Sequence, residues 1–168
     1  ADSVEQLCHL AARQLRGLVG FDRVMVYRFD DDGCGSVVAE TLAPGMEPFL
    51  GLRYPASDIP QQARALYLRN LVRLIADVGD DGAAITPTVS PEGAPLDLSL
   101  SAVRAVSPIH REYLRNMGGG ASMSVAIVKR GKLWGLFACH HPAPRHLGYG
   151  IRTAAELFGQ LFSFLLEQ

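Results

Sequence analysis

Hydrophobic positions at the start of the chain follow the period of an α-helix. They are Val4, Leu7, Cys8, Ala11, Leu15 and Leu18, and the two glycines of GLVGF end the run. Side chains three and four positions apart share one face of a helix, so the chain is predicted to open with an amphipathic helix.

Two pairs of segments have the composition of β-strands. RVMVYRF (23–29) and GSVVAETL (35–42) are rich in β-branched and aromatic residues and flank the acidic, glycine-bearing turn DDDGCG. ASMSVAIVKR and KLWGLFACHH lie on either side of Gly131 in the second half of the chain. Each pair therefore predicts a β-hairpin.

The remaining segments complete an alternating order of elements. A helical pattern runs from about 60 to 70, and the strand-like LVRLIAD follows it. Ser107 and Pro108 supply an N-cap and a first-turn proline for a helix that Gly118 to Gly120 end, and a last helix is expected from about 151 to 167. The order α-β-β-α-β-α-β-β-α predicts an α+β domain with an antiparallel sheet covered by helices.

A stretch rich in proline, glycine and aspartate, from Val78 to Asp97, has no hydrophobic period. Irregular inserts of this length are uncommon inside compact domains, and those that occur are usually functional or disordered. We expect this one to have a function.

Composition limits the classes of partner. The 168 residues are 48% hydrophobic and 20% charged, which suits one globular domain over 1–168. A formal net charge of -1 gives no field for nucleic acid or anionic membranes. No apolar run approaches the ~18 residues of a membrane span, and the first residues lack a signal-peptide layout, so a cytoplasmic location is expected. Cys8, Cys34 and Cys139 lack the spacing of a disulfide framework or a zinc site, and no metal is expected.

Strand alternation groups several polar side chains. Ser122 and Ser124 are two positions apart, so their hydroxyls share one face of their predicted strand. By the same rule His140 points to the opposite face from Cys139, which argues against a nucleophile and base pair in ACHH.

Other polar groups come from helices and from single arginines. His110, Tyr113 and Met117 share a helix face, and Arg73 and Arg104 could each bind a carboxylate through a guanidinium. Taken singly, each has an ordinary alternative, such as a core histidine, a helix cap or a surface ion pair. Together with the long insert and the apolar residues, they indicate a pocket for a large, flat, apolar ligand that carries carboxylates.

Several long motifs then resemble one family closely. YPASDIP (54–60), QARALYLRNLVRLIAD, VRAVSPIHREYLRNMG and LWGLFACHH resemble the chromophore-binding GAF domain of bacterial phytochromes, the red-light photoreceptors, over essentially the whole chain. The resemblance implies a GAF fold, red/far-red light sensing through biliverdin, a linear tetrapyrrole with two propionates, and no catalysis by this domain. It also implies that the stretch from 78 to about 101 is the family's lasso, the loop through which the segment before the domain threads as a knot.

The resemblance implies a role for each site residue. Asp58 would offer its main-chain carbonyl to the pyrrole N–H groups while its carboxylate faces outward, and Ile59 and Pro60 would pack on the rings. One propionate would be bound by Tyr67, Arg73 and Arg104, and the other by Ser122 and Ser124. His110 would lie over the inner rings with Ser107 nearby. The outermost ring, whose rotation is the family's photochemistry, would be surrounded by Tyr27, Tyr54, Tyr113, Met117 and His140.

One departure concerns attachment of the chromophore. Plant and cyanobacterial members attach their bilin to a cysteine immediately before the helix histidine, and here that position is Ile109. Bacterial members that use biliverdin carry their cysteine in an upstream PAS segment. Biliverdin is therefore expected to bind this chain without a covalent bond.

The resemblance also implies missing partners. The chain is expected to be excised from a PAS-GAF-PHY receptor, and any histidine-kinase output would lie outside it. The broad apolar surface of the closing helix, from Leu157 to Leu166, predicts a homodimer through the terminal helices.

Three rival functions remain open at this point. A haem sensor would use His110 as an axial ligand, and a cyclic-nucleotide module would need main-chain phosphate-binding groups at a helix start. A cysteine-dependent reductase would need cysteines that meet in space, and their positions give no sign of it. Haem is the strongest of the three.

Overall fold

The computed structural model describes residues 2–168. The helices are α1 (Asp2–Val19), the short 3-10 helix η1 (Ala56–Asp58), α2 (Gln61–Arg69), α3 (Pro108–Asn116) and α4 (Tyr149–Leu165). The strands are β1 (Arg23–Phe29), β2 (Gly35–Leu42), β3 (Arg53–Tyr54), β4 (Val72–Ile75), β5 (Ala121–Lys129) and β6 (Lys132–His141).

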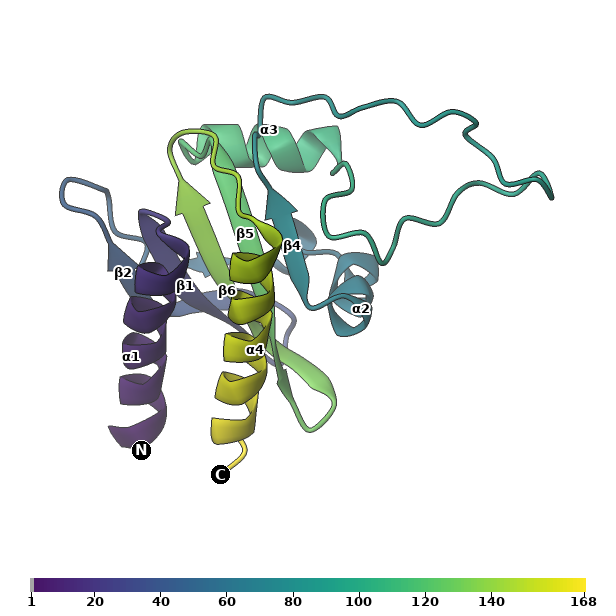
Figure 1. Ribbon diagram of the computed structural model, residues 1–168. Helices are drawn as coiled ribbons and strands as arrows, with labels where there is room; N and C mark the ends of the chain where they lie inside the picture. Colours follow the sequence, from purple (N-terminus) through teal and green to yellow (C-terminus); the bar gives the residue numbers. More distant parts are fainter. Residues whose placement is uncertain (1) are drawn as a thin grey trace.

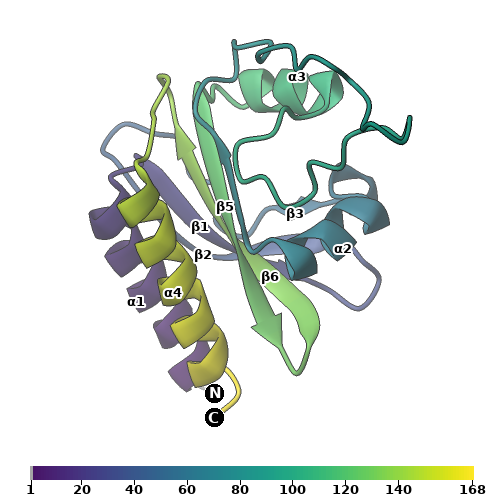
Figure 2. The same ribbon diagram turned by 45° about the vertical axis from the view of Figure 1, so that its right-hand side comes forward.

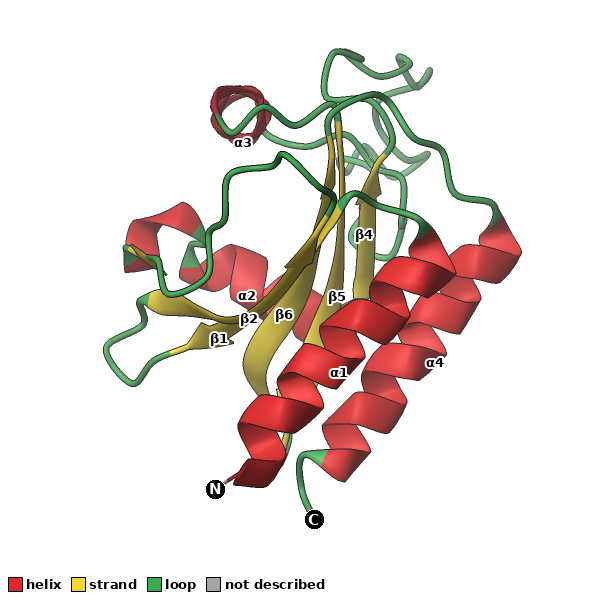
Figure 3. Ribbon diagram, turned by 90° about the vertical axis from the view of Figure 1, so that its left-hand side faces the viewer, coloured by secondary structure: helices red, strands yellow, loops and turns green. Residues whose placement is uncertain are grey.

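The six strands form one antiparallel sheet in the order β3-β2-β1-β6-β5-β4. Figure 2 shows α1 and α4 side by side on one face of this sheet, with α2 and α3 beyond the other face. The N-terminal end of α1 and the last turn of α4 lie at the same end of the molecule (Figure 3). The fold is therefore three layers, with the sheet in the middle.

The main core lies between the sheet and the pair α1 and α4. Alternate residues of the central strands point into it, including Val24, Val26, Met123, Val125 and Phe137, all of them buried. Phe137 meets Phe158 and Phe162 of α4 edge to face, with ring centroids 5.7 and 4.9 Å apart. Apolar burial of this kind contributes roughly 1.5–3 kcal/mol for each large side chain. The alternation that fills this core sends every other side chain to the opposite face.

Residues 79–107 contain no helix and no strand, and the chain there forms turns with one isolated bridge between Val89 and Pro95. Figure 1 shows this insert as a long loop that reaches away from the sheet beside α3. Most of its side chains are exposed. The predicted irregular insert is therefore confirmed in its place.

The predicted order of elements and the α+β class are confirmed, with two additions that the sequence did not reveal. β3 has two residues and η1 has three, so neither is long enough to show a hydrophobic period. The N-cap position of Ser107 is correct, but its side chain forms no capping hydrogen bond. Gly118, at a φ of 73°, ends α3 as expected, because it takes a left-handed conformation that other residues rarely adopt.

Across residues 2–168, no helix has both the length and the hydropathy that crossing a membrane requires.

Candidate functional site

Strand register gathers the polar side chains on the sheet face opposite α1 and α4. One row across the strands consists of Ile75, Ser122, His140 and Arg23, as the paired positions of β4, β5, β6 and β1. The next row consists of Arg73, Ser124, Ala138 and Met25. Ser122 and Ser124, predicted to share a face, therefore lie beside Arg73 and His140. Four strands, which come from three separate parts of the sequence, contribute to one surface.

Arg73, Tyr67 and Arg104 converge at the β4 side of this face. The Arg73 guanidinium carbon lies 4.9 Å from the centroid of the buried Tyr67 ring. Burial lowers the pKa of Arg104, and the nearby charge of Arg73 lowers it further. Arg104 donates hydrogen bonds to the main-chain oxygens of Ser101 (2.8 Å) and Ser99 (3.4 Å), which place it at the end of the insert. Two like charges are thus held together.

This cationic cluster has no acidic partner. Among residues 4–168, whose side chains the structure describes, no carboxylate forms an ion pair with Arg73 or Arg104. The Arg73 Nε atom is buried and has no hydrogen-bond partner. A buried polar atom without a partner is costly, and functional sites are where such costs are found. The arrangement fits an anionic group such as a carboxylate.

His110 brings α3 into the same cluster. Burial lowers the pKa of His110, and the charge of Arg73 adds to the effect. Its imidazole stacks on Tyr113, one turn further along α3, with the ring planes 13° apart and the centroids 6.2 Å apart. The predicted helix face therefore exists, and Leu114 anchors it by packing on Ile75 and Val78.

The charge of Asp58 acts on three phenol groups at the other end of the face. Burial raises the pKa of Tyr27 to about 12, and the charge of Asp58 adds to the increase. Burial and the Asp58 charge likewise raise the pKa of Tyr113, and burial raises that of Tyr54. The rings of Tyr27 and Tyr54 are 6.1 Å apart.

One expectation about Asp58 concerned its carboxylate, which was expected to face outward, away from the site. The charge of Asp58 raises the pKa of Tyr113, Tyr27 and Tyr54. The direction in which the carboxylate points stays a prediction. Asp58 is only half-buried, so water also reaches it.

The other predicted residues differ in how closely they join these groups. Ile59 packs against the hydrophobic cluster that contains Tyr27 and against the one that contains Tyr67, which connects the two ends of the face. Met117 is half-buried at the C-cap of α3. Pro60 and Ser107 are exposed at the starts of α2 and α3. Ile109 is 79% exposed.

Arg23 and Glu40 are residues of this region that the sequence interpretation missed. Arg23 is 4% exposed, and its Nε lies 3.4 Å from Glu40 Oε1, in a side chain that is 1% exposed. Arg23 also donates to the main-chain oxygen of Glu47, and its guanidinium lies 3.5 Å from the centroid of Phe49. Glu40 Oε2 accepts hydrogen bonds from the amides of Phe49 (2.9 Å) and Leu50 (3.0 Å). The pair fixes the loop after β2 against the site.

A signal for Arg23 was present in the sequence. Arg23, Met25 and Tyr27 are alternate residues of RVMVYRF, so Arg23 shares a strand face with the predicted site residue Tyr27. A charge on a buried strand face needs a partner, and that requirement points to an acid on the neighbouring strand.

The three cysteines lie apart from one another, and two of them lie on the far side of the sheet from the site. Cys8 and Cys139 are buried in the main core, on the α1 and α4 side of the sheet, and burial raises the pKa of both thiols. Cys34 is half-buried in the turn between β1 and β2. Within the described part of the chain, no group of three or more His, Cys, Asp or Glu side chains could hold a metal ion.

With this geometry in place, comparison with known proteins defines the class. Residues 3–167 match the GAF domain family. The match spans nearly all of the chain, so the protein belongs to the GAF domain family.

The similar relatives within this family are phytochromes. The bacteriophytochrome of Pseudomonas aeruginosa is 52% identical over 156 residues, which cover 92% of this chain and 21% of the relative. Cyanobacterial phytochrome B of Nostoc is 51% identical over 159 residues, covering 94% of this chain and 21% of the relative. The chain therefore spans about a fifth of the length of these relatives.

Solved structures give the same result. The chromophore-binding domain of a bacteriophytochrome from R. palustris is 43% identical, with a TM-score of 0.94 over 96% of this chain and 55% of that one. The photosensory core module of the Stigmatella aurantiaca phytochrome is 47% identical, with a TM-score of 0.90 over 97% of this chain and 32% of that one. The predicted GAF fold and the predicted resemblance to bacterial phytochromes are both confirmed.

The pH dependence of folding stability tests the surroundings of His140. Burial lowers the pKa of His140 to about 4 from its ordinary 6.5, and the charges of Arg23 and His110 add to the effect. Between these two pH values the unfolded state binds more protons than the folded state. The free energy of unfolding is therefore expected to fall as the pH falls through this window, by up to about 3 kcal/mol from this residue.

The measurement is urea unfolding at a series of pH values, with His140→Gln beside the wild type. The variant should lose this part of the pH dependence, whereas His146→Gln, a change at an exposed position, should keep it. Equal slopes for the wild type and His140→Gln would show that the prediction is wrong.

Proposed function

We propose that this chain is the light-sensing, chromophore-binding domain of a red/far-red photoreceptor and that its ligand is biliverdin. The observation that carries the proposal is the cationic cluster of Arg73 and Arg104, which has no acidic partner among the side chains of residues 4–168 and lies on the polar face of a GAF domain. The similarity to structures described as chromophore-binding domains supports it.

The chain's own groups suit an elongated ligand with anionic side chains. Arg73, Arg104 and Tyr67 would hold one propionate, since two guanidinium groups and a phenol converge there. Ser122 and Ser124, next to Arg73 in the strand register, would donate hydroxyl hydrogen bonds to the other. His110, lying between this cluster and Tyr113, would contact the middle of the ligand.

The other end of the site would hold the outer ring. Tyr27, Tyr54 and Tyr113 supply aromatic surface there, and His140 and Met117 would complete the surroundings of the ring. Main-chain oxygens of the loop at Asp58 would accept hydrogen bonds from pyrrole N–H groups, while Ile59 and Pro60 would pack on the rings. A bound open-chain tetrapyrrole supplies absorption of red light and isomerisation about a methine bond.

The rest of the receptor is part of the same proposal. The chain would be one domain of a longer protein that contains PAS and PHY domains, consistent with the fraction of the relatives that it spans. Signal output would come from a domain outside this chain, and the domain itself would not be an enzyme.

We also propose that the domain forms a homodimer through α1 and α4. Leu157, Leu161 and Phe164 of α4 are more than half exposed. An apolar groove between the two helices is lined by Leu10, Phe158, Leu161 and other residues. A single monomeric species in sedimentation equilibrium at high protein concentration would contradict it.

The experiment that tests the function is a titration of the purified chain with biliverdin, followed by absorption spectra before and after red light. Binding should produce a red absorption band, and illumination should change it reversibly. A dominant blue band after addition of haem, with no response to biliverdin, would support a haem sensor with His110 as an axial ligand and overturn the proposal.

Replacement of Arg104 tests the propionate contacts. Arg104→Ala should weaken biliverdin binding by roughly 1.5–3 kcal/mol, because a charge-assisted hydrogen bond to a carboxylate is lost. Fluorescence or absorption titration gives the dissociation constants. Arg13→Ala, at an exposed position of α1, is the matched control and should bind as the wild type does. Unchanged binding by Arg104→Ala would show that Arg104 is not a ligand residue.

The thiol positions predict that bound biliverdin is not covalently attached. A thioether bond needs a reactive thiolate beside the ligand, and Cys8 and Cys139 are buried on the other side of the sheet. Biliverdin should therefore be absent from the protein band of a denaturing gel viewed by zinc fluorescence. Ile109→Cys should retain a fluorescent band, and Ile109→Ser, which lacks the sulfur, should not. A fluorescent band in the unmodified chain would disprove the prediction.

A further inference from the structure

Arg64 makes an unusual set of contacts near the start of α2. Its guanidinium donates to three main-chain oxygens, those of Ile59 (2.7 Å), Ala56 (3.2 Å) and Gly33 (2.5 Å). It also lies over the Phe29 ring, 4.4 Å from the centroid. Among residues 4–168, it forms no ion pair with an acidic side chain. Its hydrogen bonds therefore serve the backbone.

The middle of the segment that Arg64 holds has little packing of its own. Residues 54–60, here called the site loop, contain η1, which has no buried residue and no side-chain capping bond. Tyr54 and Ile59, near the two ends of the loop, pack against hydrophobic clusters of the sheet face. Pro55 and Pro60 lack the backbone N–H that could tie the loop down. The main-chain bond that stabilises the turn is from the Asp58 amide to the Pro55 oxygen, at 3.1 Å. The bonds from Arg64 to Ala56 and Ile59 therefore add restraint where the loop packs least.

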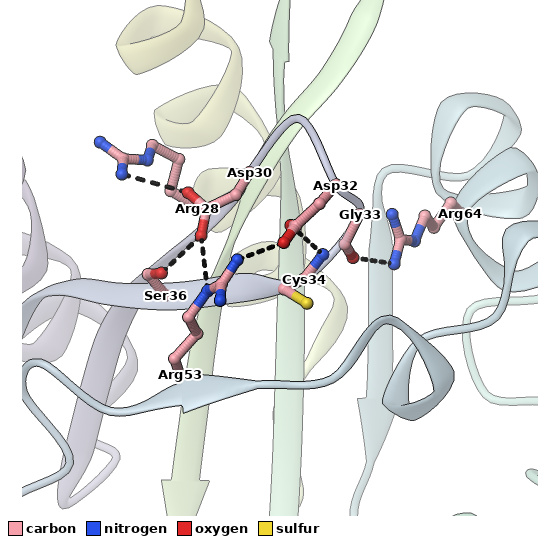
Figure 4. A network of polar contacts seen from close by, with 8 residues as sticks. All are labelled: Arg28, Asp30, Asp32, Gly33, Cys34, Ser36, Arg53 and Arg64. Atoms are coloured by element: carbon pink, nitrogen blue, oxygen red, sulfur yellow. Dashed lines mark hydrogen bonds and ion pairs between the residues drawn. The ribbon is translucent and has the colours of Figure 1, made fainter.

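The third contact of Arg64 joins the site loop to a rigid turn. Residues 30–34, the hairpin turn between β1 and β2, are closed by bonds between Asp30 and Cys34 and from the Gly33 amide to Asp30. The Ser36 hydroxyl donates to Asp30 at 2.7 Å, and the Cys34 amide donates to Asp32 at 3.0 Å. Figure 4 shows the bonds from Ser36 and Cys34 together with the one from Arg64 to the Gly33 oxygen.

A second arginine attaches the other end of the site loop to the same turn. Arg53, immediately before Tyr54, forms ion pairs with Asp30 and Asp32 (Figure 4). The site loop is thus bracketed by Arg53 before it and Arg64 after it, and both contact the turn at residues 30–34. Exposed ion pairs contribute little individually, whereas the half-buried Arg64 makes three hydrogen bonds with one rigid group.

We propose that Arg64 is a positioning residue that holds the site loop in one conformation by fastening it to the hairpin turn. It acts through the carbonyls of Ala56 and Ile59, and so sets the place of Asp58 and Ile59 without being a ligand residue itself. The consequence for biliverdin rests on the function proposed above. A loop that is held in place before binding avoids the entropic cost of becoming ordered on binding.

The test combines hydrogen exchange of the protein without ligand and titration with biliverdin. Arg64→Ala should speed amide exchange at least roughly tenfold in peptides covering the site loop, and leave exchange in β5 and β6 as in the wild type. Its affinity for biliverdin should fall at least roughly tenfold. Arg64→Lys, which keeps the charge and can make fewer of the bonds, should lie between the two. Arg13→Ala is again the control.

The outcomes separate the two proposals. Unchanged exchange in the site loop of Arg64→Ala would overturn the positioning role, whatever the ligand does. Faster exchange throughout the sheet would also overturn it, because Arg64 would then support the whole fold. Faster loop exchange with unchanged affinity would overturn the link to binding. A wild-type chain that binds no biliverdin would overturn the proposed function, and exchange would still decide whether Arg64 fastens the loop. If Arg64→Ala does not fold, Arg64→Lys carries the same comparison.

Discussion

Strand alternation in the central sheet is the constraint on which the rest of the structure depends. In β5, Met123, Val125 and Ile127 fill the core under α1 and α4, which obliges Ser122 and Ser124 to face the other way. The same requirement in β6 and β1 places His140 beside Ser122 and Arg23 beside His140. A shift of one residue in a strand would exchange its two faces and bury polar groups in the main core. Stability of the core therefore also fixes the polar surface.

Electrostatic cost distinguishes the two kinds of cation on that surface. Arg23 is nearly fully buried and paired with Glu40, and removing one member of such a pair typically costs 3–5 kcal/mol. Arg73 and Arg104 lie close together, with the Nε of Arg73 buried and unbonded. Folding alone gives no reason to hold two like charges there without an acid. A ligand with carboxylates would give one, and this is why the proposed function depends on this cluster and not on the number of polar groups.

How much of this was predictable from the sequence depends on the range of each interaction. Composition and the neighbouring turns identified the strands RVMVYRF and KLWGLFACHH with the bounds that the structure has. β3 and η1 were missed because two or three residues have no period. The shared face of Ser122 and Ser124 is a local property and was predicted. Their closeness to Arg73 and His140 depends on strand register, which spacing within one strand does not determine.

Arg23, Arg64 and Arg73 show why residue type alone could not reveal their roles. A guanidinium has five donors in a fixed plane and accepts nothing, so its role depends on which acceptors surround it. Arg23 contacts a carboxylate and a carbonyl, Arg64 donates to three carbonyls, and Arg73 lies over the ring of Tyr67. The first arrangement stabilises a buried loop and the second orders an exposed one. The third leaves the buried Nε donor of Arg73 without an acceptor, and a buried donor without a partner is the property expected of a binding site for an anion.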